Sequence, residues 1–157
     1  MSIALIGSGA IASYVRNQLE AAGHPIAAMV VRPGKESQGA TPAVSSVSDL
    51  PPNVDLLIDC AGHEALGTHG VSALRSGIDV VTVSIGALAD AALEAEIAKA
   101  AREGDAVLHL ASGAIGALDA LRAARAGHLK NVTYVGRKPP KGWTGSPAED
   151  TLDLANL

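Results

Sequence analysis

Short apolar runs alternate with longer amphipathic segments over roughly the first 110 residues of the chain. Runs such as SIALI and VDLLIDC are bounded by glycine or small residues, which is typical of buried parallel strands. The segments between them repeat apolar residues every three or four positions, which favours helices. The predicted strands are residues 2–6, 26–31, 54–60, 79–83 and 106–110. The predicted helices are a segment around residues 11–19 that Gly23 ends, then residues 64–76, 89–102 and 114–126.

This alternation predicts the fold class. Parallel neighbouring strands need crossover connections, and helices supply them. We therefore predict an α/β fold with a Rossmann doubly wound parallel sheet as a first domain over residues 1–111. Residues 32–52, which are rich in Gly, Pro and Ser, are predicted to form a loop with a short helix or strand.

The pattern changes after residue 111. A helix is followed by an alternating segment at 132–136, predicted as a strand, and then by the basic, Pro-rich GRKPPKGW. One helix, one strand and a loop are too little for an independent hydrophobic core. Residues 112–157 are therefore predicted to begin a second, α+β domain that is incomplete within this chain.

A glycine-rich turn follows the first predicted strand and opens the first predicted helix. The run Gly7-Ser-Gly9-Ala-Ile-Ala12 fits G-x-G-x-x-A. Gly7 permits the tight turn, Gly9 leaves room for a pyrophosphate, and Ala12 keeps the helix close to the sheet. Free N–H groups and the positive end of the helix dipole then face the phosphates. The motif predicts a nicotinamide dinucleotide, NAD or NADP, rather than a plain connecting turn, held by Gly7, Gly9, Ala10, Ile11 and Ala12.

The end of the second strand bears on the choice of cofactor. A carboxylate there would bind the adenosine ribose of NAD. This chain instead has Arg32, then Lys35, with no acid before Glu36. The two cations suit the 2′-phosphate of NADP, but they also fit ordinary solvated loop charges, so both cofactors stay open.

Three further strand ends carry small residues where an α/β sheet binds its ligands. Ala61, Gly62 and His63 follow the third strand, and His63 either donates to a ligand or only begins a helix. The predicted cofactor contacts there are Ala61, Gly62, His63, Ser84 and Gly86, joined by Ala114 in the SGAIG turn after the fifth strand. In the same region Asp119 is predicted to be structural, and His109 to be a buried core histidine.

Composition excludes several classes of protein. The chain is 48% hydrophobic and 18% charged, so it is core-forming rather than disordered. A net charge of −4 and 2% aromatic residues argue against nucleic-acid binding. The one cysteine, Cys60, excludes an internal disulfide and is predicted to be a buried apolar residue, and the histidines show no metal-binding spacing. Without a membrane-spanning run or a leader, a cytoplasmic location is expected.

Four motifs beyond the first turn resemble the L-aspartate dehydrogenase family. They are CAGHEAL, VSIGALAD, SGAIGALDAL and GRKPPKGWTGSPAE, and the resemblance covers essentially the whole chain. It implies NAD- or NADP-dependent oxidation of L-aspartate to iminoaspartate, which can feed NAD biosynthesis, or the reductive amination of oxaloacetate. It also implies a Rossmann domain followed by an α+β domain, a homodimer, and a cofactor contact from Ala114.

The chain also departs from that family. Members continue for roughly another hundred residues, the scale of a domain, and that part carries a cofactor-contacting asparagine and the histidine taken as catalytic acid/base. We therefore assign no catalytic residue and expect either a fragment or a truncated product. A non-catalytic dinucleotide-binding module is the alternative. A homoserine- or dihydrodipicolinate-type oxidoreductase is less favoured because of the GRKPPKGWTGSPAE segment. In that segment Arg137, Lys138 and Lys141 either attract a dicarboxylate or form a solvated basic loop.

Overall fold

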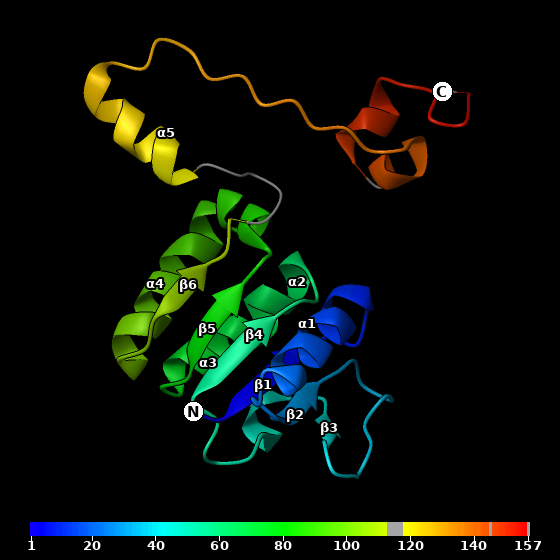
Figure 1. Cartoon of the computed structure of the whole chain (residues 1–157), viewed down its shortest axis with the longest axis vertical. Helices are drawn as coiled ribbons and strands as arrows, with labels where there is room; N and C mark the ends of the chain where they lie inside the picture. The colour runs from blue at the N-terminus through cyan, green and yellow to red at the C-terminus, as the bar shows by residue number, and fades with distance from the viewer. Residues whose placement is uncertain (113–117, 145, 157) are drawn as a thin grey trace. The chain divides into compact units, whose positions relative to one another are not determined.

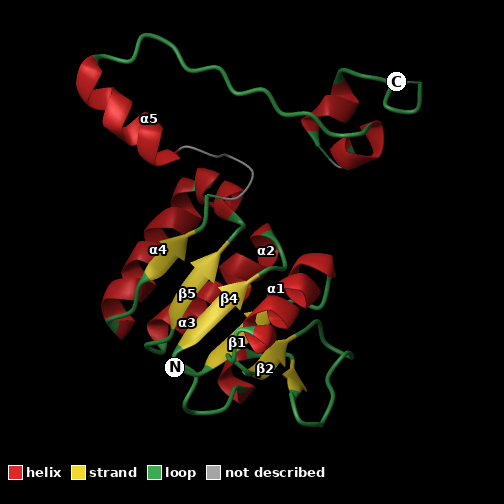
Figure 2. Ribbon diagram, in the orientation of Figure 1, coloured by secondary structure: helices red, strands yellow, loops and turns green. Residues whose placement is uncertain are grey.

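The computed structural model describes residues 1–112, 118–144 and 146–156. The chain divides into two compact units, Met1–Leu118 and Asp119–Leu157. Figures 1 and 2 show the helices and strands of both units. The predicted functional boundary at residue 111 stays a prediction.

A six-stranded parallel sheet forms the centre of the first unit. The strands are β1 (Ile3–Ile6), β2 (Ile26–Val30), β3 (Ala43–Val44), β4 (Leu56–Asp59), β5 (Asp79–Thr82) and β6 (Leu108–Leu110). Their order in the sheet is β3-β2-β1-β4-β5-β6, and every pair is parallel. This is the doubly wound Rossmann order, in which the winding direction reverses between β1 and β4. The predicted fold class is confirmed for this part of the chain.

Helices follow β1, β4 and β5, as the periodicity predicts. They are α1 (Ala10–Ala21), α2 (His63–Ala65), α3 (Val71–Arg75) and α4 (Ala91–Gly104), with 3-10 turns at Val47–Asp49 and Ile85–Ala89. The predicted helix at 64–76 is interrupted by a π-helical turn, Leu66–Gly70, that joins α2 to α3. Asp90 caps α4 by accepting a 2.9 Å hydrogen bond from the backbone N–H of Ala92.

The core lies on both faces of the sheet, because successive side chains of a strand point to opposite faces. On one face Ile3 and Leu5 of β1 pack with Val15 and Leu19 of α1. On the other face the buried residues come from the strands, α3 and α4, and include Ala4, Ile6, Leu57, Leu74, Val80 and Ile97. Figure 1 shows these helices covering the sheet. Two covered faces explain why the strands are almost wholly apolar.

The second unit differs from the sequence prediction. The described part of the predicted helix is α5 (Leu118–Ala124), followed by a 3-10 turn, Arg125–Gly127. The strand predicted at 132–136 is wrong, since residues 128–139 contain neither helix nor strand. Val132, Tyr134 and Val135 are 54%, 61% and 69% exposed. An alternating pattern forms a strand only where a neighbouring strand pairs with it, and the described residues of this unit contain none.

Two short 3-10 turns, Pro140–Trp143 and Pro147–Asp150, follow in the second unit. Ser146 caps the second turn by accepting from the N–H of Ala148. Within the described part of the chain, no helix combines the length and apolarity that crossing a membrane requires.

Candidate functional site

The turn from β1 into α1 is built around Gly7. Its N–H donates to the carbonyl of Val30 at 2.8 Å, which ties the turn to the end of β2. Its φ is +103°, a conformation that residues with a side chain rarely adopt. A Cβ at this position would lie 3.1 Å from the Cβ of Ala61. The fold itself therefore requires glycine at position 7.

Gly9, at the start of α1, lies in a different environment. Its φ of −80° and ψ of −173° are open to any residue. Apart from Gly9 itself and its two chain neighbours, no heavy atom of the described residues lies within 4 Å of where its Cβ would stand. No side chain caps this end of α1, Ala10 and Ile11 are exposed, and Ala12 is fully buried against the sheet. The first N–H groups of α1 therefore face open space beside Gly9.

The turns after β4 and β5 lie beside this first turn because of the strand register. Ile6 pairs with Asp59, and Asp59 pairs with Thr82, so β1, β4 and β5 end side by side. The N–H of Cys60 donates to the carbonyl of Ile6 at 3.1 Å, and the N–H of Ala111 donates to that of Thr82 at 3.0 Å. These strand ends lie next to the reversal point between β1 and β4, where an open α/β sheet binds its ligand.

His63 closes the side of the site next to β5. Gly62, with a φ of +114°, turns the chain, and His63 is the first residue of α2, so it does begin a helix. It is also exposed, and its Nε2 lies 2.8 Å from where a Cβ on Gly86 would stand. The histidine ring therefore packs over Gly86. In the β5 turn Ser84 is only 5% exposed, whereas Gly86 is open to solvent.

A buried polar network that was not predicted from the sequence lies at these strand ends. Asp59, the last residue of β4, is 0% exposed, and so is Thr82, the last residue of β5. The Thr82 hydroxyl donates to Asp59 Oδ2 at 2.7 Å, and Asp59 Oδ1 accepts from the N–H of Ala61 at 2.9 Å. Thr82 Oγ1 also accepts from the N–H of Ser84 at 2.9 Å. A carboxylate closing an otherwise apolar strand was the available signal.

The network affects two neighbouring groups. Burial raises the pKa of the half-buried Cys60 thiol, and the charge of Asp59 raises it further. Burial also lowers the pKa of His69, on the π-helical turn, while the charge of Asp59 acts in the opposite direction. The raised pKa favours the protonated thiol. The predicted full burial of Cys60 is wrong, since the residue is only half-buried at the end of β4.

Cys60 is accordingly expected to react slowly with a thiol reagent in the native chain. Because its pKa is raised, the thiolate fraction at each pH below that pKa is smaller than in a free cysteine. The rate of alkylation by iodoacetamide should rise with pH through a midpoint above that of the same chain unfolded in urea. Equal midpoints for the native and unfolded chain would contradict this.

The loop after β2 leaves two cations without a carboxylate partner. Arg32 and Lys35 are exposed, and neither forms an ion pair within the described part of the chain. The nearby acid, Glu36, is held by its own loop. Hydrogen bonds from its own backbone N–H and from Ser45 lower the pKa of its carboxyl.

The remaining predicted positions lie elsewhere. Ala114 falls outside the described residues, and Asp119 is exposed on α5. The prediction of a buried His109 is wrong, since its side chain is 54% exposed and its Nε2 lies 3.9 Å from the Asp79 carboxylate. His109 lies on β6, which is the edge strand of the sheet as far as the described residues define it. Among the described residues, no three His, Cys, Asp or Glu side chains are placed to hold a metal ion.

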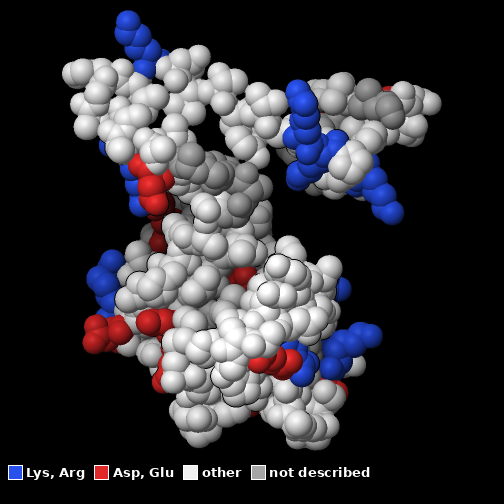
Figure 3. Space-filling model, in the orientation of Figure 1, with Lys and Arg blue, Asp and Glu red and all other residues white. Residues whose placement is uncertain are grey.

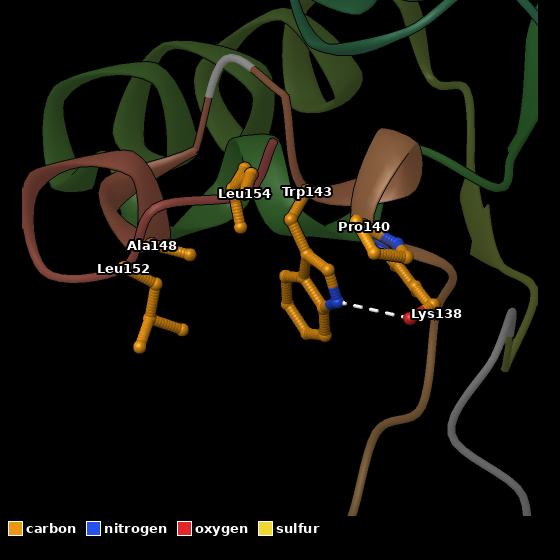
Figure 4. A pocket seen from close by; sticks show the side chains of 6 residues that line it. All are labelled: Lys138, Pro140, Trp143, Ala148, Leu152 and Leu154. Atoms are coloured by element: carbon orange, nitrogen blue, oxygen red, sulfur yellow. Dashed lines mark hydrogen bonds between the residues drawn. The ribbon is translucent and has the colours of Figure 1, made fainter. Parts of the chain in front are cut away.

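The basic segment of the second unit packs on itself. The Lys138 ammonium lies 5.0 Å from the centre of the Trp143 ring, a cation–π contact. The indole N–H of Trp143 donates to the carbonyl of Lys138 at 3.2 Å, as Figure 4 shows. A small apolar hollow beside them is lined by Lys138, Pro140, Trp143, Ala148, Leu152 and Leu154. Figure 3 shows acidic and basic side chains mixed on the visible face of the first unit.

The chain is similar to known oxidoreductases. Residues 7–111 match the family model described as the NAD-binding domain of homoserine dehydrogenase. An L-aspartate dehydrogenase of Ruegeria pomeroyi is 52% identical over 159 residues, covering 99% of this chain and 58% of the relative. One from Pseudomonas aeruginosa is 39% identical over 168 residues, covering 100% and 62%. The chain thus spans less than two thirds of the length of these curated relatives.

Solved structures support the fold. An aspartate dehydrogenase from Thermotoga maritima matches with a TM-score of 0.62 at 18% identity, covering 98% of this chain and 69% of that one. A biliverdin reductase from Synechocystis matches with a TM-score of 0.59 at 18% identity, covering 88% and 48%. Together with the family model and the sequence identities, the sheet order leads to one assignment. The chain belongs to the family described as the NAD-binding domain of homoserine dehydrogenase, and over nearly its whole length it is similar to L-aspartate dehydrogenases.

Proposed function

We propose that this chain is the cofactor-binding portion of an NAD(P)-dependent L-aspartate dehydrogenase. The observation that carries the proposal is the turn at Gly9, where the fold leaves space that a pyrophosphate would fill. A Cβ there meets no described neighbour, and uncapped N–H groups of α1 begin beside it. The names of the relatives support L-aspartate, or oxaloacetate with ammonia, as the substrate class.

Residues of the turns that follow the strands would contact different parts of the cofactor. Gly9, Ala10, Ile11 and Ala12 would hold the pyrophosphate through backbone N–H groups, whereas Gly7, whose N–H is engaged by the Val30 carbonyl, would shape the turn. Ala61, Gly62, His63, Ser84 and Gly86 would contact the nicotinamide half, and the family resemblance adds Ala114 as a cofactor contact. When bound, the cofactor supplies a hydride acceptor for the α-carbon of aspartate. This chain's own residues would orient the dinucleotide along the strand ends. We propose no histidine of this chain as the catalytic acid or base.

We further propose that NADP is preferred over NAD, because no carboxylate of the described residues pairs with Arg32 and Glu36 is held by its own backbone N–H and by Ser45. Arg32→Ala is expected to weaken NADPH binding about tenfold, the loss of one charge-assisted contact with the 2′-phosphate. NADH binding should change little, since NADH lacks that phosphate. Fluorescence titration of both cofactors measures the two effects. Lys141→Ala, which removes a cation from the second unit, is the control. Equal loss for NADH and NADPH on Arg32→Ala would contradict the preference.

Two assays on the purified chain test the proposed function. The first is the titration of NADH and NADPH, where saturable binding of at least one is expected. The second is the oxidation of reduced cofactor in the presence of oxaloacetate and ammonia, where turnover supports the dehydrogenase. Binding without turnover supports the alternative, a non-catalytic dinucleotide-binding module. No saturable binding of either cofactor would overturn both. A homodimer and a cytoplasmic location stay predictions from the family resemblance.

A further inference from the structure

A carboxylate without a cationic partner is buried under the proposed nicotinamide end of the site. Asp59 is 0% exposed, and within the described residues it forms no ion pair. Burying a carboxylate is unfavourable unless hydrogen bonds replace those of water. Asp59 has two such bonds, from the Ala61 N–H and from the Thr82 hydroxyl. Two apolar side chains of the same volume at positions 59 and 82 would pack here without the free-energy cost of burying a carboxylate.

The hydrogen bonds of this carboxylate hold the backbone of two turns in place and do not involve another charged group. Asp59 Oδ1 holds the N–H of Ala61, two residues along in the β4 turn. Asp59 Oδ2 orients the Thr82 hydroxyl, and Thr82 Oγ1 accepts from the N–H of Ser84 in the β5 turn. One carboxylate therefore sets the direction in which both turns leave the sheet. The same turns bring His63 against Gly86.

Resting on the proposed function, we propose that Asp59, acting through Thr82, is a positioning residue for the nicotinamide half of the cofactor. In a doubly wound sheet the adenosine half lies toward β2, and the other half lies across the reversal point, toward β4 and β5. The Asp59–Thr82 network touches only the turns on that second side. Within the described residues none of its hydrogen bonds goes to Gly7, Gly9 or Arg32, although Ala61, whose N–H it holds, packs against Gly7. Its loss should therefore weaken one half of the binding site selectively.

A matched pair of variants at Thr82 tests this selectivity. Thr82→Val keeps the shape of the side chain but removes the hydroxyl, whereas Thr82→Ser keeps the hydroxyl. Calorimetric titration of each variant with NADPH and with ADP-ribose, which lacks nicotinamide, compares the two halves. Thr82→Val is expected to weaken NADPH binding about tenfold and leave ADP-ribose binding unchanged. Thr82→Ser should bind NADPH with an affinity within about twofold of that of the original chain, because it keeps the hydroxyl.

Two further variants separate positioning from stability. Val80→Ala removes buried volume from the same strand without touching the network, so it should lower the melting temperature and leave both affinities unchanged. Asp59→Asn keeps the Oδ1 acceptor but faces the Thr82 hydroxyl with an amide nitrogen. It should reproduce the selective loss of NADPH affinity, and it provides the test if Thr82→Val does not fold.

The outcomes distinguish this inference from the proposed function. If the original chain binds neither dinucleotide, the proposed function fails. If it binds NADPH but Thr82→Val and Asp59→Asn bind NADPH equally well, only the positioning role of Asp59 fails. It fails equally if both ligands weaken by the same factor, or if Val80→Ala shows the same selective loss.

Discussion

Gly9→Ala is expected to weaken the binding of NADH and NADPH about a hundredfold, or about 2.8 kcal/mol, while the fold stays intact. The reason lies in the surroundings of the two motif glycines. Gly9 has ordinary backbone angles, and apart from its two chain neighbours no described heavy atom lies within 4 Å of its missing Cβ. Nothing in the fold therefore needs glycine at this position. A pyrophosphate approaching the start of α1 does need it.

Gly7→Ala supplies the contrasting variant from the same motif. Gly7 has a φ of +103° and only 3.1 Å between its missing Cβ and that of Ala61. Alanine there should lose roughly 1–2 kcal/mol of stability from the left-handed backbone alone. Gly39→Ala is a neutral control, since its Cβ would also meet open space.

Thermal unfolding and cofactor titration together test this comparison. Gly9→Ala should melt close to the original chain, with at most about 1 kcal/mol lost from a weaker helix cap. Gly7→Ala should melt lower. Cofactor affinity that survives Gly9→Ala would show that the pyrophosphate does not approach this turn, and the proposed function would lose its main support.

The sequence predicts well those features that depend on neighbouring residues. The turn at Gly7 and Gly9 is a local pattern of small residues between a strand and a helix, and the structure has it there. The buried strands are recognisable because both of their faces are covered, which makes them continuous apolar runs. Even the two-residue β3 falls in the segment where a short strand was one of two alternatives.

Features that depend on pairing between distant residues could not be predicted in this way. Asp59 and Thr82 are 23 positions apart, and only the register of β4 against β5 brings them together. His109 is exposed because β6 is the edge of the sheet, which an apolar run alone does not reveal. The 132–136 segment alternates like a strand, yet the described part of its unit offers no partner strand. Local patterns indicate which elements can form, and tertiary pairing decides which do.

Gly104→Ala is expected to destabilise the first unit by about 3 kcal/mol, as overpacking of a close contact does. Gly104 is the last residue of α4, where alanine would ordinarily favour the helix by about 1 kcal/mol. Here the added Cβ would overlap the carbonyl oxygen of Leu74 and lie 2.9 Å from the backbone nitrogen of Gly77. Both obstacles are backbone atoms, so no side-chain rotation relieves the overlap. The ends of α3 and α4 would have to move apart.

That movement would reach the core, because Leu74 is fully buried between α3 and the sheet. A drop of roughly 10 °C in melting temperature is expected by calorimetry for a unit of this size. The contact between Gly104 and the end of α3 lies away from the strand ends that form the candidate site. Folded Gly104→Ala should therefore bind cofactor with unchanged affinity at low temperature, the reverse of the result for Gly9→Ala. A melting temperature of Gly104→Ala equal to that of Gly39→Ala and of the original chain would contradict the close backbone packing of α3 against α4.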